Sequence, residues 1–174
     1  EPIKNGLINQ TYKVVLEINT REASFILQEI NQHIFTAPEK IMDNIVLVGQ
    51  YLSQNNYQGE ILKPLPCSNG QRFHLDEQGK YWRLFPFIEN SRVHNRVTDP
   101  NLAFEAALAF GKYLAALWHL PPQRLHETLP HFHHPQRRFK VFEIIHEDNR
   151  LQNRKLARTA IEFVQKKVTL LQRC

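Results

Sequence analysis

A short stretch near the N-terminus carries residues that could bind an anionic ligand. In the sequence GLINQTY, Gly6 precedes Asn9 and Thr11 between two segments rich in β-forming residues. A glycine turn can present backbone N–H groups to a phosphate, and the side chains of Asn9 and Thr11 could add hydrogen bonds. One glycine is weak evidence for such a site. From these residues alone, an ordinary hairpin turn is the simpler interpretation.

A histidine cluster, formed by His131, His133 and His134, offers a second candidate site. Two donors at alternate positions could share a metal, but no neighbouring carboxylate or cysteine completes a ligand set. We therefore expect solvated loop histidines, or hydrogen-bonding groups beside a substrate, rather than a zinc site. The sequence contains no GxGxxG, Walker, CxxC or HExxH motif.

The composition narrows the classes of partner. A net charge of +5 is compatible with nucleic acid or with a site for anionic phosphates. The late basic residues are not interleaved with aromatic residues, so we expect solvated helix faces and no nucleic-acid partner. We expect no membrane partner and no signal peptide, because every long apolar run contains Glu or Lys. Two cysteines, Cys67 and Cys174, suggest a reducing, cytoplasmic setting. The chain starts at Glu1 rather than Met, so its N-terminus could have been trimmed.

The elements that would position these residues indicate an α+β fold. We expect antiparallel strands at 2–7, 11–18 and 24–30, and then a helix that begins at a capping box formed by Thr36 and Glu39. Ile41, Ile45, Val48 and Leu52 would form its inner face. Further strands are expected at 60–65, 72–75 and 80–85, the last two joined by a turn at 76–79. A polar connector, 89–99, follows.

The organising element of the second half is a helix over 100–120, capped by Asp99. Only one narrow polar stripe interrupts its apolar surface, so we expect it to be buried on most sides. Amphipathic helices are predicted at about 136–147, with Phe139, Phe142 and Ile145 inward, and at about 154–172. The second would turn inward Leu156, Ala160, Phe163, Val164, Val168 and Leu171.

The order of several stretches resembles the aminoglycoside phosphotransferase superfamily, and within it the N-acetylhexosamine 1-kinases. These stretches are Gly6–Tyr12, Phe25–Asn31, Pro38–Ile45, Tyr81–Glu89 and Pro130–His133. The resemblance implies a protein-kinase-like fold of which the chain is an N-terminal portion. Residues 1–89 would be a nucleotide-binding β-sheet lobe, 90–99 a connector, and 100–174 the first helices of an incomplete helical lobe.

The resemblance also implies roles for individual residues. The loop carrying Gly6, Asn9 and Thr11 would cover the ATP phosphates, and Gln28 would occupy the place of the strand lysine that pairs with phosphate. Asp43 or Asn44 would stand where kinases carry a helix glutamate.

The hinge between the lobes would be formed by Phe85, Pro86, Phe87 and Ile88. The Pro86 carbonyl and the Ile88 N–H would bond adenine. The alternative for each position is structural, with Gln28 as an edge polar residue and Phe85 and Phe87 as core residues.

Two departures from the family pattern matter. Gln28 is neutral, so it can hydrogen-bond a phosphate but cannot neutralise one. The catalytic aspartate and the Mg²⁺ ligands are expected beyond Cys174, and we interpret 146–149 (HEDN) as a turn between helices. An incomplete helical lobe would expose Phe110, Leu114, Leu117 or Trp118 and favour self-association.

The resemblance therefore implies a fragment of an ATP- and Mg²⁺-dependent kinase that phosphorylates a hydroxyl of an N-acetylhexosamine-type sugar and is inactive alone. Aminoglycoside, choline and homoserine are alternative acceptors. A non-catalytic kinase-like binding module is the alternative from another class, and a nucleic-acid binder, suggested by a pI near 9.3, is weaker.

Overall fold

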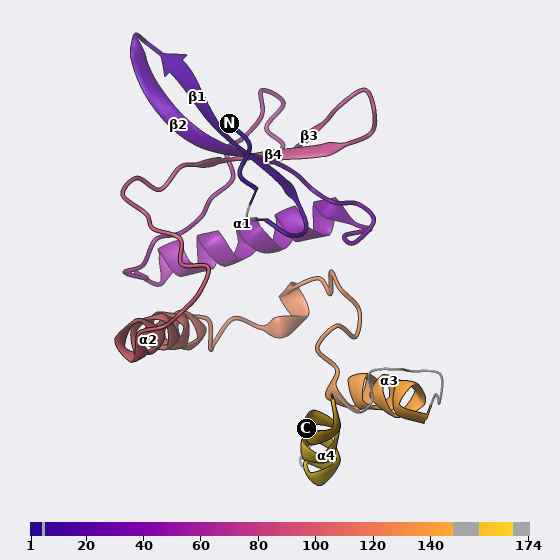
Figure 1. Cartoon of the computed structure of the whole chain (residues 1–174). Coiled ribbons are helices and arrows are strands. Elements are labelled where there is room, and N and C mark those ends of the chain that lie inside the picture. The colour runs from indigo at the N-terminus through magenta and orange to yellow at the C-terminus, as the bar shows by residue number, and fades with distance from the viewer. Residues whose placement is uncertain (5, 148–156, 169–174) are drawn as a thin grey trace. The chain divides into compact units, whose positions relative to one another are not determined.

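The computed structural model describes residues 1–4, 6–147 and 157–168 of the chain. The chain divides into two compact units, Glu1–Thr128 and Leu129–Cys174. The described residues of the first unit form a sheet, two α-helices and the short 3-10 helix η1 (Pro122–Arg124), and those of the second unit form two further α-helices (Figure 1). The mixed α+β class predicted from the sequence is confirmed. The boundary between the compact units falls after Thr128, whereas the sequence suggested a lobe boundary at 90–99.

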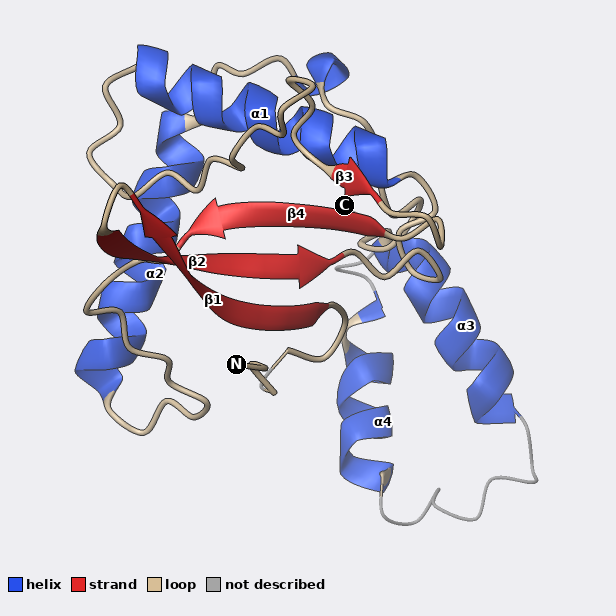
Figure 2. Cartoon of the chain, turned by 90° about the horizontal axis from the view of Figure 1, so that it is seen from above, coloured by secondary structure: helices blue, strands red, loops and turns tan. Residues whose placement is uncertain are grey.

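A four-stranded antiparallel sheet organises the first unit, with the strand order β1-β2-β4-β3 (Figure 2). Its strands are β1 (Gln10–Ile18), β2 (Arg21–Glu29), β3 (His74–Leu75) and β4 (Tyr81–Pro86). β1, β2 and β4 correspond to expected strands, because each has the β-branched and aromatic content that suits a pleated surface. β2 lies between β1 and β4, so Gln28 is on an inner strand and not at an edge.

Two tight turns set the register of this sheet. Asn19 and Thr20 join β1 to β2, and both have positive φ angles, of 50° and 65°, as a two-residue hairpin turn of the primed type requires. The predicted turn between β3 and β4 is confirmed. Gly79 has φ +77° there, and the Asp76 N–H donates to the Lys80 carbonyl at 3.0 Å. Both turns depend on residues that tolerate left-handed backbone.

Two expected strands do not form. In the N-terminal segment, only Pro2 makes a bridge, to Tyr12, while the Ile3 N–H donates to the Thr11 carbonyl at 2.8 Å. The segment 60–65 has no strand either, and a single backbone hydrogen bond joins the Leu65 N–H to the Leu84 carbonyl at 2.8 Å. Prolines explain this, because residues 2, 64 and 66 have no N–H to donate to a ladder.

Helix α1 (Pro38–Gln54) runs below the sheet in Figure 1. The predicted capping box is wrong: the N-cap residue is Ala37, which has no side-chain hydrogen bond. The Glu39 carboxylate instead accepts a hydrogen bond from the Tyr81 hydroxyl of β4. The buried positions are Pro38, Met42, Gly49 and Leu52, so the inner face is centred one residue from the predicted Ile41–Leu52 stripe.

Helix α2 (Pro100–Ala116) begins as predicted, with the Asp99 side chain accepting from the Asn101 N–H at 2.9 Å. The helix ends four residues earlier than expected. The prediction that it is buried on most sides is wrong, because none of its residues is buried. Phe110 is 62% exposed and, just beyond the helix, Trp118 is 81% exposed. Leu114 is exposed as well, whereas Leu117 is half-buried.

The second unit contains α3 (Pro135–Glu147) and α4 (Arg158–Lys166). They contact each other through Gln165 Nε2 and His146 Nε2, 3.3 Å apart. Ile145 and Phe163, both expected inward, are exposed. The positions 148, 149, 156 and 171, which carried sequence-based interpretations, lie outside the described residues. Within the described residues, no helix has the length and apolar character that crossing a bilayer would require.

Candidate functional site

A cavity of about 700 Å³ lies in the first unit between α1 and the face of β2 and β4. The strands contribute Ile26, Gln28, Arg83 and Phe85, which alternation places on one face of the sheet, since Ile26 pairs with Phe85 and Gln28 with Arg83. The rest of the wall includes α1 residues and the segment 86–88. Cavities of this size, apolar with a few polar groups, are typical of small-molecule sites.

The predicted hinge borders this cavity. Phe85 is buried, and Pro86, Phe87 and Ile88 all line the cavity. The Phe87 N–H donates to the Ser24 carbonyl at 3.1 Å, which ties residue 87 to the neighbouring strand. Since successive residues of a strand direct their backbone groups to opposite sides, the Pro86 carbonyl points away from β2. The Ile88 N–H makes no hydrogen bond to any residue that the structure describes.

Phe87 of the predicted hinge also contacts β1. The Lys13 ammonium lies over its ring, 3.9 Å from the centroid, a distance at which the ring quadrupole attracts a cation. Lys13 thus places a positive charge beside the hinge end of the cavity. All four residues predicted as a hinge therefore line the cavity, and Phe85 is also buried in the core, while their role as a hinge stays a prediction.

A polar row crosses three strands of the sheet. The register pairs Thr11 of β1 with Gln28 of β2, and Gln28 with Arg83 of β4. Gln28 Nε2 donates to Thr11 Oγ1 at 2.9 Å, and Gln28 Oε1 accepts from Arg83 Nε at 2.9 Å and from Arg83 Nη2 at 2.5 Å. Thr11 Oγ1 in turn lies 3.5 Å from the Asn9 carbonyl. The amide of Gln28 is therefore engaged at both ends.

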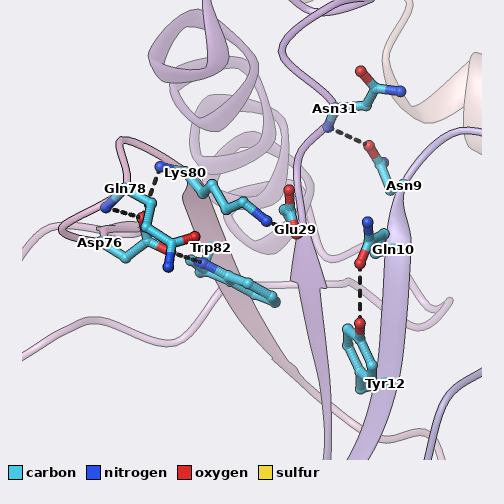
Figure 3. Close-up of polar contacts among 9 residues, drawn as sticks. All are labelled: Asn9, Gln10, Tyr12, Glu29, Asn31, Asp76, Gln78, Lys80 and Trp82. Atoms are coloured by element: carbon cyan, nitrogen blue, oxygen red, sulfur yellow. Dashed lines mark hydrogen bonds and ion pairs between the residues drawn. The ribbon is translucent and has the colours of Figure 1, made fainter.

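The loop before β1 is fastened to the end of β2. The Asn31 N–H donates to Asn9 Oδ1 at 3.0 Å (Figure 3), and Asn31 Nδ2 donates to the Ile8 carbonyl at 3.1 Å. A Cβ atom at Gly6 would lie 3.3 Å from the Asn9 carbonyl oxygen, so the loop folds closely on itself at this glycine. Of the predicted loop residues, Asn9 and Thr11 thus stabilise the loop and the polar row in this structure.

The two candidate helix residues have different surroundings. Asp43 is not in the cavity wall: its carboxylate lies 3.6 Å from His126 Nε2, and its side chain is 69% exposed. Asn44 does line the cavity, but its amide donates to the His126 carbonyl and accepts from the His126 N–H, both at 2.8 Å. This pair of bonds fastens α1 to the segment after α2. Neither residue contacts Gln28 as a kinase helix glutamate would contact the strand lysine.

Arg83 is a charged residue of the cavity wall that sequence reasoning missed. Its signal was present, because the strand KYWRLF alternates and places Arg83 on the same face as the apolar Phe85. Its guanidinium lies 5.3 Å from the centre of the Phe85 ring, and Nη1 lies 3.9 Å from the Met42 sulfur. Burial lowers the pKa of Arg83 from its usual value, because a low-dielectric environment disfavours the charged form.

A second polar cluster closes the β3–β4 hairpin outside the cavity (Figure 3). The Asp76 carboxylate accepts from the N–H groups of Lys80 and Gln78, both at 2.9 Å, and from the indole of Trp82 at 2.8 Å. These bonds, that of Lys80 first, lower the pKa of Asp76. The Lys80 ammonium pairs with Glu29 at 3.3 Å. We assign this cluster to the stability of the hairpin.

The histidines of the cluster make aromatic contacts with residues close to them in the sequence. The rings of His131 and His134 stand edge to face at 6.1 Å, and His133 packs against Phe132 at 4.7 Å. In the part of the chain that the structure describes, no three His, Cys, Asp or Glu side chains gather where they could hold a metal ion.

No model of a known protein family matches the chain.

Proposed function

We propose that the sheet unit is the nucleotide-binding part of an ATP-dependent kinase that phosphorylates a hydroxyl group of a small molecule. One observation carries the proposal: the cavity is lined both by Ile88, whose N–H makes no hydrogen bond to a described residue, and by Gln28 and Arg83 of the polar row. The hinge offers adenine a backbone donor between apolar walls, and the row offers hydrogen bonds and a positive charge to a polar group.

The acceptor is proposed from resemblance alone. The stretches that resemble N-acetylhexosamine 1-kinases favour a sugar hydroxyl, and no residue lining the cavity distinguishes that sugar from choline, homoserine or an aminoglycoside. The residues that the structure describes bring together no ligand set for Mg²⁺. We therefore assign nucleotide binding, and no catalytic step, to the described residues.

Calorimetry with ATP and with adenosine tests the proposal. We expect both to bind the 174-residue chain, and we expect Ile88→Pro to abolish binding because it removes the N–H that would bond adenine. Val97→Pro is the matched control, since Val97 is an exposed connector residue outside the cavity wall. Equal loss in both variants, or no binding to the parent chain at concentrations up to millimolar, would exclude the nucleotide site.

A non-catalytic binding module is the second candidate, and one observation favours it. Asn9, Thr11 and Gln28, the side chains that would approach phosphate, are hydrogen-bonded within the chain. A module of this kind would show no rise in melting temperature with ATP, whereas a nucleotide site would show a rise that grows with ligand concentration.

A further inference from the structure

Arg83 is a half-buried cation that pairs with no carboxylate of the described residues. No carboxylate of the described residues lies within 4.0 Å of its guanidinium, whereas Lys80 pairs with Glu29 and Arg158 with Glu162. Partial burial of a charge is unfavourable unless an opposite charge or hydrogen bonds compensate for it. The neighbours of Arg83 are the neutral Gln28, a methionine sulfur and an aromatic ring.

The guanidinium keeps donors for a further ligand. Its planar group carries N–H donors on three nitrogens. Gln28 Oε1 accepts hydrogen bonds from Nε and Nη2. Among the described residues, Nη1 contacts the Met42 sulfur, a weak acceptor, at 3.9 Å. The Nη1 edge therefore lacks an oxygen acceptor among the described residues. Two parallel N–H groups of an arginine match the oxygens of a phosphate.

The polar row holds this group in one orientation. Gln28 Oε1 accepts hydrogen bonds on the Nε side of the guanidinium, while Gln28 Nε2 donates a hydrogen bond to the Thr11 hydroxyl. An arginine fixed in this way loses less rotamer entropy when it binds an anion than a free surface arginine does. Gln28, which the resemblance placed at the position of a phosphate-binding lysine, thus acts in the structure on a neighbouring cation.

We propose that Arg83, positioned by Gln28 and Thr11, is the cation that binds the phosphate groups of the nucleotide. This inference rests on the proposed function for its ligand. Arg83 and Phe87 are on one strand and its continuation, four residues and roughly 13 Å apart. A nucleotide whose adenine lies at the hinge would extend along β4 toward the guanidinium. The positive charge that Gln28 lacks is then supplied by the strand beside it.

Binding of three ligands to four proteins tests this role. The ligands are ATP, adenosine and inorganic tripolyphosphate, which separate the contribution of the phosphates from that of adenine. The variants are Arg83→Gln, which removes the cation, and Gln28→Glu, which keeps Arg83 but provides it with a carboxylate. Arg21→Gln is the matched control, because Arg21 is exposed at the start of β2 and is not part of the cavity wall.

We expect Arg83→Gln and Gln28→Glu to weaken ATP and tripolyphosphate binding about tenfold or more, as the loss of a charge-assisted hydrogen bond does. The affinity of both variants for adenosine should stay within about twofold of that of the parent protein, because adenosine binding does not depend on the Arg83 guanidinium. The Arg21→Gln control should bind all three ligands within about twofold of the parent, because it keeps that guanidinium. Melting temperatures would show that each variant is folded. The ratio of ATP to adenosine affinity is the decisive readout, because a general loss of structure would weaken both ligands.

The outcomes separate this inference from the proposed function. If ATP and adenosine bind but Arg83→Gln leaves their ratio unchanged, the role of Arg83 is refuted and the nucleotide site stands. If tripolyphosphate binds in an Arg83-dependent way while adenosine does not bind, the anion site stands and the nucleotide proposal fails. If tripolyphosphate does not bind the parent chain and ATP binds no better than adenosine, the role of Arg83 is refuted.

Discussion

The packing of α1 against the segment 60–65 allows us to predict how a substitution at Gly49 changes the free energy of unfolding. This glycine is buried in the interior of α1, where glycine is about 1 kcal/mol less favourable than alanine. A Cβ atom at this position would lie 3.5 Å from Ile61 Cγ2 and 3.6 Å from Lys63 Cγ, both ordinary van der Waals contacts. Gly49→Ala should therefore raise the free energy of unfolding by about 0.5–1 kcal/mol. For a chain of this size that corresponds to a rise of about 1–4 °C in melting temperature.

Urea unfolding of the parent and variant chains, followed by far-UV circular dichroism, measures this change. Gly79→Ala is an informative contrast, because the φ angle of +77° at Gly79 makes alanine unfavourable by about 1–2 kcal/mol. The two substitutions should therefore shift stability in opposite directions. A destabilised Gly49→Ala variant would mean that residues 60–65 approach α1 more closely than described, and would refute the packing that shapes this wall of the cavity.

Three further predictions concern the hairpin, the exposed helix and catalysis. The folded-state pKa of Asp76 is lowered, so its stabilising contribution is present above the unfolded pKa of about 3.9 and is lost as pH falls through the folded value. The difference in free energy of unfolding between the parent and Asp76→Asn, measured by urea unfolding, should therefore shrink below about pH 4. A difference that widens below that pH would contradict this prediction. The exposed Phe110 and Trp118 should cause concentration-dependent self-association that a double substitution to serine reduces; light scattering that finds a clean monomer at high concentration would contradict it. The 174-residue chain should not phosphorylate N-acetylglucosamine or N-acetylgalactosamine in a coupled assay of ADP release, and turnover would direct attention first to Asp148, outside the described residues.

Local signals predicted much of the fold. β1 and β2 follow from β-branched and aromatic content, the β3–β4 turn from Asp76 and Gly79, and the start of α2 from the Asp99 cap. These features depend on residues a few positions apart. The strands expected at 2–7 and 60–65 do not form. Strand pairing depends on the backbone partners of a segment and on the positions of its prolines, and a β-type residue pattern does not identify those partners.

Features that depend on distant partners were not predictable. The polar row needs the register of two strand pairs, Thr11 with Gln28 and Gln28 with Arg83, and the last pair joins residues 55 positions apart. Sequence reasoning singled out Gln28 and Thr11 but could not connect them to Arg83. The burial of α2 was predicted from its apolar surface, but none of its residues is buried. An apolar helix surface indicates that the helix needs a packing partner, but it does not identify that partner.

The most direct test of a nucleotide site at the hinge is an amide spectrum of the chain labelled with ¹⁵N-isoleucine, recorded during titration with ATP. We predict that the Ile88 amide shifts progressively as ATP binds, because its N–H would acquire adenine as an acceptor. Ile45 of the cavity wall should shift as well, while Ile18, at the end of β1 and outside that wall, should not. Binding of ATP that leaves the Ile88 amide unmoved, or saturating ATP that moves no isoleucine amide, would contradict the account.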